Sequence, residues 1–361
     1  MEKKKKVILI VSLSVLSAVV TYFAGGVIAT KTVTDKLLNV RGSTVDSLNT
    51  LEYKIQKNRA DYPSLEIREE LSFKCGKETL RGYLYTVDNP IGVVITAHGI
   101  NTLADAHGQL QDYFVKNNYN VFSFDMTGCG ASSGKGMKTL HESRKCVSSA
   151  IKTLKNNAKT SSLPIFLVGH SWGGYAVVAA TEDHKDVSAV ASFSGYNQPG
   201  DAMYGFAEYA VGKGVVLTKP SLDFSLSTLY GNDEWFKACT AIKHNPNTKY
   251  VIVQGEDDVV VPLKRYSIYT NVNEKKLTNT TKILLSGIGH SGPWREKSSH
   301  DYSEELNKEL DSLRKQYGYQ IPHDVEAKFI SKIDKEKSSQ MNLDLMNQIN
   351  DIFKESISSS H

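Results

Sequence analysis

The sequence predicts an α/β fold in which helices flank a mostly parallel central sheet of about eight strands. Between residues 65 and 318, short apolar runs alternate with helical patterns. Most of these runs show no helical spacing, which is typical of strands buried on both faces of a parallel sheet. The first two runs, 66–73 and 80–86, instead alternate apolar and polar residues around a turn. They predict an antiparallel hairpin at the start of the sheet.

The N-terminal segment lies outside this pattern. Residues 1–6 form a basic tail with four lysines, and residues 7–29 carry no charge. At about 1.5 Å per residue, this run can cross a bilayer. The basic tail predicts a single-pass anchor in the cell membrane, with everything after Ala29 outside the cytoplasm. The alternative is a signal peptide whose cleavage near Ala29 releases a secreted protein. Residues 30–64 are polar and predict a juxtamembrane spacer.

The elements of the main domain follow in order. After the hairpin, strands are predicted over 91–97, 120–125, 165–168, 187–193, 250–254 and 281–285. Helices are predicted over 106–116, 140–154, 175–180, 262–272 and 302–317, because their apolar residues recur on one face or because small apolar residues suit close packing on a sheet. Pro262 favours a helix start, since its missing amide hydrogen is not needed there.

Two segments depart from the alternation. Residues 196–247 interrupt it with short helical, aromatic-rich patterns, which predicts a lid over the C-terminal edge of the sheet. After residue 318, the extension 319–361 has apolar residues at helical spacing and predicts two amphipathic helices. These helices are expected to pack on the domain, although contact with lipid headgroups or a partner is also open.

A candidate nucleophile lies between one predicted strand and its helix. Gly169-His170-Ser171-Trp172-Gly173 has the G-x-S-x-G pattern of a sharp turn that lifts a serine hydroxyl clear of a sheet. The Trp172 amide, at the helix N-terminus, is placed to donate to a developing negative oxygen.

A serine needs a base, and the base needs a group that orients it. Of ten histidines, His290 is the candidate base because it lies in a Gly-rich loop directly after a predicted strand. His170 is expected to pack behind the serine, and His300 to lie at the surface. The acid is one of three consecutive carboxylates, Glu256, Asp257 and Asp258.

Composition and spacing argue against other classes of function. A net charge of +4 is too small to indicate a nucleic-acid partner. The four cysteines, at 75, 129, 146 and 239, have no metal-ligand spacing, and a disulfide among them stays open. The loop 128–134 lacks the phosphate-binding pattern. Neither a cofactor nor a metal ion is expected.

These residues resemble the α/β-hydrolase superfamily in their order along the chain. The elbow, His98-Gly99, Gly255-x-x-Asp258-x-x-Val261-Pro262 and Gly289-His290 are most similar to its monoacylglycerol-lipase-like and serine-aminopeptidase-like branch, which includes membrane-anchored bacterial members. The resemblance covers about residues 65 to 318. It implies an α/β-hydrolase fold, selects Asp258 as the acid with Asp257 as its rival, and implies the Ile100 amide as the second oxyanion donor.

The expected function is that of a membrane-anchored serine hydrolase that cleaves a carboxylic ester through an acyl-enzyme. A serine peptidase or amidase of the same fold is the alternative within the enzyme class. A binding or scaffold protein without turnover is the alternative of another class.

Overall fold

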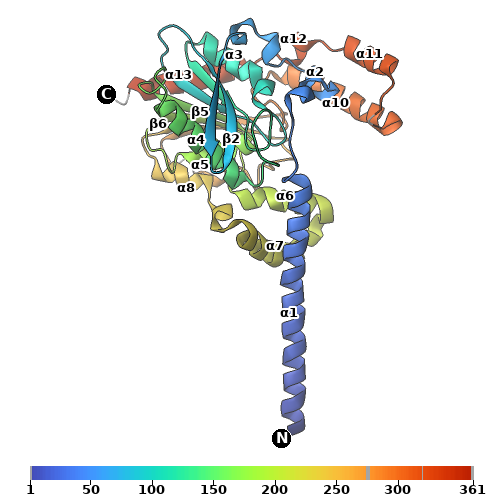
Figure 1. Ribbon diagram of the computed structural model, residues 1–361. Helices are drawn as coiled ribbons and strands as arrows, with labels where there is room; N and C mark the ends of the chain where they lie inside the picture. The colour runs from blue at the N-terminus through green and yellow to red at the C-terminus, as the bar shows by residue number, and fades with distance from the viewer. Residues whose placement is uncertain (1, 274–276, 319, 359–361) are drawn as a thin grey trace.

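A computed structural model of the chain describes residues 2–273, 277–318 and 320–358. Residue 1 of the predicted basic tail, and residues 319 and 359–361 of the predicted C-terminal extension, lie outside the described residues. The sheet lies within one layered body, and a single long helix projects from it (Figure 1).

Eight strands of the described chain form one sheet in the order β1-β2-β4-β3-β5-β6-β7-β8. Their bounds are β1 Glu69–Cys75, β2 Glu78–Tyr85, β3 Val93–Ala97, β4 Asn120–Phe124, β5 Ile165–His170, β6 Val187–Phe193, β7 Lys249–Gly255 and β8 Thr280–Leu285. The pairs β1–β2 and β2–β4 are antiparallel, and all the others are parallel. The predicted mostly parallel sheet with an antiparallel hairpin is therefore confirmed.

Helices cover both faces of the sheet. Successive strand residues point to opposite sides, so the apolar strands have a face to bury on each side. On β5, Leu167 packs in the cluster that contains α4 and α5, whereas Phe166 and Val168 pack in the cluster that contains α3 and α13. The helices of these two layers are α3 Gly108–Lys116, α4 Leu140–Lys155, α5 Trp172–Ala180, α8 Ala238–His244 and α13 Leu343–Ser358.

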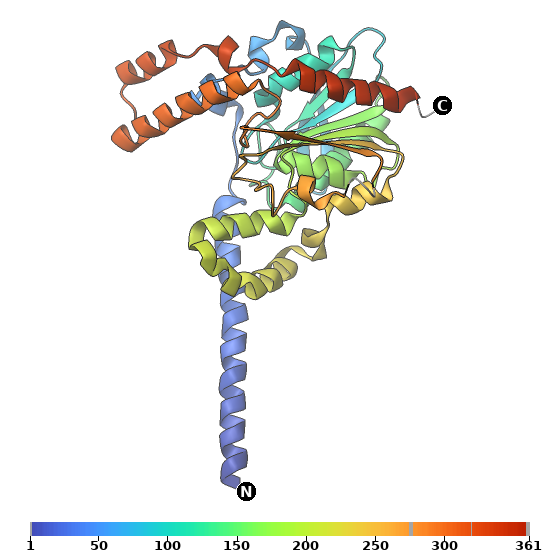
Figure 2. The ribbon, with the colours of Figure 1, turned by 180° about the vertical axis from the view of Figure 1, so that it is seen from behind.

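The C-terminal extension supplies part of this core. Its helices are α11 His323–Ser331, α12 Lys335–Ser338 and α13, and they follow α10 Lys297–Tyr317. On α13, Phe353 is fully buried, with its ring 4.8 Å from that of Phe166 and 5.8 Å from that of Phe114. The extension therefore packs on the domain, as expected, and α13 lies along the sheet (Figure 2).

The predicted helix over 262–272 is wrong. The chain makes turns there, and only Ile268–Asn271 forms a short helix, α9. Just before this stretch, the Asp258 carboxylate accepts the amides of Val260 and Val261 at 2.9 and 2.8 Å. Within the stretch, the Tyr266 carbonyl accepts the Asn197 amide at 2.7 Å, so this backbone group is not available to a helix. Extended pairing of Ser267 with Tyr196 then keeps the chain out of helix until α9 begins.

Much of the segment 30–64, the predicted juxtamembrane spacer, packs against the domain. The N-terminal helix α1 runs from Glu2 to Leu37, and residues 38–43 then lie along the Gly-rich loop. The Gly42 amide donates to the Gly128 carbonyl at 2.9 Å, and the Gly130 amide donates to the Ser43 carbonyl at 2.7 Å. A Cβ at Gly136 would lie 2.2 Å from the Leu38 carbonyl oxygen, so these glycines allow the close approach of two backbones.

The rest of that segment also packs on the domain. It forms short helical turns and a four-residue helix, α2 Leu51–Lys54. Ile55 and Leu65 behind them are buried. These apolar residues, although scattered in a polar stretch, therefore attach the segment to the domain by packing.

The insertion 196–247 is helical, as expected. It contains α6 Pro199–Val211, α7 Val215–Tyr230 and α8. In both views α6 and α7 lie beside the upper part of α1 (Figures 1 and 2). Among the described residues, α1 is the helix long and apolar enough to cross a membrane, a property that a membrane anchor and a signal sequence share.

The four cysteines are free thiols. Cys129 and Cys146 are buried, and Cys239 lies half-buried on α8. The Cys75 thiol donates a hydrogen bond to the Cys146 sulfur at 3.6 Å, and no disulfide joins the two.

Candidate active site

Ser171 occupies a strained turn between β5 and α5. Its φ is 57° and its ψ is −113°, a conformation that side-chain-bearing residues rarely adopt. The two elbow glycines make this turn possible. A Cβ at Gly169 would lie 2.3 Å from the Gly173 carbonyl oxygen, and a Cβ at Gly173 would lie 2.1 Å from the Ala97 carbonyl oxygen. Strand β5, its neighbour β3 and helix α5 can therefore meet only with glycine at both positions.

The structure brings the three predicted side chains Ser171, His290 and Asp258 together at the carboxyl ends of their strands. The His290 Nε2 atom is 2.8 Å from the Ser171 hydroxyl oxygen, and the His290 Nδ1 atom is 2.8 Å from the Asp258 carboxylate. Because a carboxylate accepts, Nδ1 carries the hydrogen and Nε2 is left to accept from the serine. This is the tautomer that a general base needs.

Asp258 is held in place by its own loop and strand. Besides the two loop amides, the Gln254 side-chain amide donates to its carboxylate at 3.0 Å. Glu256 and Asp257 are exposed, so only Asp258 of the three consecutive carboxylates faces His290. Gln254 was not predicted, although a polar residue at the end of an otherwise apolar strand is a signal that could have found it.

Two backbone amides lie free beside the serine. Within the described residues, neither the Ile100 nor the Trp172 amide donates a hydrogen bond. The Trp172 amide belongs to the first turn of α5, where the helix dipole favours negative charge. A Cβ at Gly99 would lie 3.5 Å from the Ser171 Cβ, so the loop that carries Ile100 lies against the serine.

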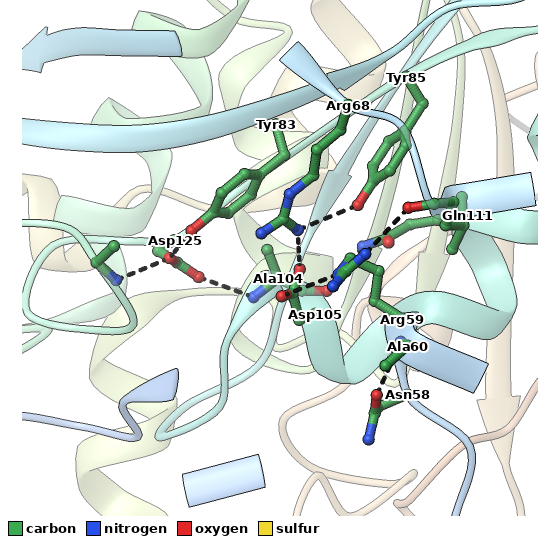
Figure 3. Close-up of polar contacts among 12 residues, drawn as sticks. Asn58, Arg59, Ala60, Arg68, Tyr83, Tyr85, Ala104, Asp105, Gln111 and Asp125 are labelled. Carbon is green, nitrogen blue, oxygen red and sulfur yellow. Dashed lines mark hydrogen bonds and ion pairs between the residues drawn. The ribbon is translucent and has the colours of Figure 1, made fainter. Parts of the chain in front are cut away.

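Asp125 fixes one end of the loop that follows β3. Its carboxylate accepts the amides of Ala104 and Ala131, both at 2.9 Å, and the Tyr83 hydroxyl at 3.1 Å (Figure 3). These bonds tie the loop after β3 to the Gly-rich loop after β4.

A second carboxylate, Asp105, ties the same loop to the segment before β1. Arg59 approaches it at 3.3 Å, and Arg68 donates to its other oxygen while lying over the Tyr83 ring at 3.7 Å (Figure 3). The carboxylate is largely buried between the two guanidinium groups. Sequence reasoning missed this cluster because its members come from three separate segments.

Three other histidines support the site without acting as the base. His170 packs behind Ser171 as expected, and its Nε2 donates to the His290 carbonyl at 2.8 Å. Burial lowers its pKa well below the ordinary value, so the ring is neutral. His98 accepts the Met126 amide at 2.9 Å. The expectation that His300 lies at the surface is wrong: it is 6% exposed and accepts the Gly289 amide at 3.1 Å, which steadies the loop of His290.

A cavity of about 750 Å³ reaches the Ile100 loop. Its walls are mostly apolar and include Leu38, Phe206 and Tyr266. Ser171 is not among its lining residues and is only 3% exposed. In the part of the chain that the structure describes, no group of side chains could hold a metal ion.

Comparisons with known proteins agree with this geometry. Residues 88–217, which include Ser171 but end before Asp258, match the model of the serine aminopeptidase family S33. The uncharacterized protein YfhR of Escherichia coli O157:H7 is 25% identical over 224 residues, which cover 61% of this chain and 70% of that protein. The esterase Pf2001 of Pyrococcus furiosus superposes with a TM-score of 0.51 at 16% identity, covering 77% of this chain and 97% of that one.

The α/β hydrolase GrgF from Penicillium sp. sh18 superposes with a TM-score of 0.48 at 20% identity, over 69% of this chain and 98% of that one. In this chain the sheet has eight strands, is mostly parallel and is flanked by helices. With its strand order and its elbow, the chain has the α/β-hydrolase fold, and its residues 88–217 are similar to the serine aminopeptidase family S33.

Proposed function

We propose that this hydrolase is a serine esterase with Ser171 as nucleophile, His290 as general base and acid, and Asp258 as the orienting carboxylate. The observation that carries the proposal is the unbroken chain of hydrogen bonds from Ser171 through His290 to Asp258. A serine hydroxyl is a weak nucleophile at neutral pH, and this arrangement is what activates it.

The chemistry proceeds in two halves. His290 Nε2 accepts the Ser171 proton as the oxygen attacks the ester carbonyl, and the Ile100 and Trp172 amides stabilise the negative oxygen that forms. His290 then gives the proton to the departing alcohol, which leaves an acyl-enzyme. A water molecule, deprotonated by the same imidazole, attacks this acyl group and releases the acid. Asp258 stays ionised and stabilises the imidazolium.

The charges of the pocket favour an ester over an aminopeptidase substrate. Glu208 and Arg265 are the charged residues among the described lining of the large cavity, and their side chains pair at 2.6 Å. An aminopeptidase needs an unpaired anion for the α-ammonium group of its substrate. Here the carboxylate is already neutralised, and the remaining walls suit an apolar acyl group.

We further propose that α1 is an uncleaved anchor that holds the domain on the outer side of the cell membrane. The packing of α1 on the lid supports retention: the Tyr22 hydroxyl donates to the Leu217 carbonyl at 2.6 Å, and the Tyr230 hydroxyl donates to Thr34 at 2.6 Å. Cleavage after Ala29 would remove Tyr22 and expose this face of the lid. The lysines before residue 7 support the orientation.

Substitutions in the triad test the catalytic roles. With p-nitrophenyl butyrate, Ser171→Ala should lower kcat by at least about 10³-fold, and Asp258→Asn by about 10²- to 10⁴-fold through loss of the correct tautomer. Asp257→Asn is the matched control and should leave kcat nearly unchanged. Activity that survives Ser171→Ala, or equal losses for the two aspartate variants, would contradict the assignment.

A substrate panel separates the esterase from the peptidase. We expect turnover of p-nitrophenyl acyl esters and no measurable turnover of aminoacyl p-nitroanilides. Acetylating the amino group of an aminoacyl ester should not weaken its cleavage, because no free carboxylate awaits an ammonium group. Cleavage of anilides with a preference for the free amine would favour the peptidase, and a folded protein inert to the whole panel would favour the scaffold alternative.

Protease treatment of intact cells tests the topology. Added protease should digest the domain, while an epitope placed before residue 2 stays protected and the chain stays in the membrane fraction. A domain that becomes accessible only after lysis would contradict the orientation. A soluble product that begins near residue 30 would contradict the anchor.

A further inference from the structure

Helix α1 and the lid helix α7 are packed too closely for an accidental contact. A Cβ at Gly26 would lie 1.6 Å from the Ser221 hydroxyl oxygen, so glycine is required where the two helices meet. The Ser221 hydroxyl donates to the Tyr22 carbonyl at 3.2 Å, and the Tyr22 hydroxyl donates in turn to the backbone of α7. Small residues at a helix contact are typical of association within membranes. The lid is thus attached to the proposed anchor.

The proposed anchor places this contact near the bilayer surface. Tyr22 comes seven residues before Ala29, the end of the uncharged run, which places it about 10 Å inside that end. The first turn of α7 lies beside it and presents Val216 and Leu217, which are 71% and 80% exposed. Interfacial helices bury an apolar face about 5–10 Å deep. The lid therefore meets the bilayer with an apolar tip.

Two largely apolar cavities lie along α1, one beside the lid and one beside the Ile100 loop. A cavity of about 370 Å³ lies between α1 and the lid and is lined by Gly25, Ala29, Val33, Phe206 and Leu222, among others. Phe206 also lines the larger cavity, whose wall contains the end of α1 and the Ile100 loop. We name the two cavities together the α1–α7 groove.

The groove has the length and chemistry of an acyl-chain site. From Tyr22 to Leu37 it follows α1 for about 22 Å, more than the roughly 15 Å of one hydrocarbon leaflet. Its hydroxyl groups are already bonded within the protein: Thr218 donates to the Val215 carbonyl at 2.9 Å, and Ser221 to α1. In the larger cavity the charged residues Glu208 and Arg265 pair with each other, so the walls that stay unpaired are mostly apolar and suit a hydrocarbon chain.

We propose that the α1–α7 groove binds one acyl chain of a membrane lipid ester, and that the enzyme takes its substrate from the bilayer. The inference rests on the proposed function and deepens it by naming the substrate class. The tail lies between the anchor and the lid while the ester carbonyl reaches Ser171. The ester C–O bond then breaks, the acyl carbon bonds to the serine oxygen, and the alcohol part of the lipid leaves with the proton from His290. Water completes the hydrolysis.

Filling the groove tests the site. A Cβ at Gly25 has open space around it, so the side chain of Gly25→Leu would enter the cavity without meeting the backbone. The full-length protein is reconstituted in phosphatidylcholine–phosphatidylglycerol vesicles, and the hydrolysis of a long-chain fluorogenic ester in the bilayer is compared with that of p-nitrophenyl butyrate. The long-to-short ratio should fall about tenfold or more in Gly25→Leu, because several methylene contacts are lost.

The matched control is Ile28→Phe, which adds bulk on the same helix at a side chain that is 68% exposed and lines neither cavity. It should keep the wild-type ratio. An unchanged ratio in Gly25→Leu overturns the groove, whereas wild-type protein that cleaves neither ester overturns the proposed function itself.

Crosslinking gives a readout that does not depend on turnover. Ser171→Ala protein in the same vesicles is irradiated with a diazirine-bearing phosphatidylcholine, and the labelled peptides are mapped. Any membrane helix reacts with surrounding lipid, so the informative peptide is 199–211 on α6, which carries Phe206. Label on this peptide that is lost in the Gly25→Leu background supports the site. Label confined to residues 7–20 overturns it.

Discussion

The close approach of three backbones at the elbow is the constraint on which the rest of the site depends. Strand β5, strand β3 and helix α5 meet where Gly169 and Gly173 leave no room for a side chain. That contact forces Ser171 into a left-handed conformation and turns its hydroxyl out of the sheet. The same contact brings the loop after β3 against the serine, so the proposed nucleophile and the proposed oxyanion donors are positioned together.

The surroundings hold this arrangement from several sides. Asp125 and Asp105 tie the loop after β3 to the Gly-rich loop and to the segment before β1. Gln254 holds Asp258, and His300 holds the loop of His290. Such supports cost the catalytic groups no reorganisation during reaction, because the partners are bonded before substrate arrives. Residues 38–43 continue the framework toward α1, so the orientation of the domain on its proposed anchor is set by hydrogen bonds and not by a loose linker.

The parts that were predictable from the sequence are those with a local signal. Such signals are visible within a few residues of the sequence. They are the glycines around Ser171, the strand directly before His290 and the apolar runs of strand length. The predicted strands and most helices of the sheet layers are confirmed on this basis. The choice between Asp257 and Asp258 had no local signal, because both follow the same strand, and it came from the family resemblance.

The parts that were missed depend on contacts between distant segments. Pro262 suggested a helix, but the backbone around Ser267 pairs with the distant segment around Tyr196. His300 looked like a surface residue because its neighbours in the chain are polar, whereas its ring is covered by the loop of His290. Residues 38–43 pack on the Gly-rich loop, and Gly26 packs against the lid. Composition did not predict either contact, since a polar stretch and a glycine each fit several environments.

The most direct test of the central claim is a crystal structure of the protein after reaction with a phosphonate ester, which mimics the tetrahedral intermediate. We expect phosphorus to be bonded to the Ser171 oxygen, with the phosphoryl oxygen about 2.7–3.1 Å from the Ile100 and Trp172 amide nitrogens. His290 should remain between the serine oxygen and Asp258. A phosphonate bound to another residue, or a phosphoryl oxygen directed away from both amides, would contradict the account.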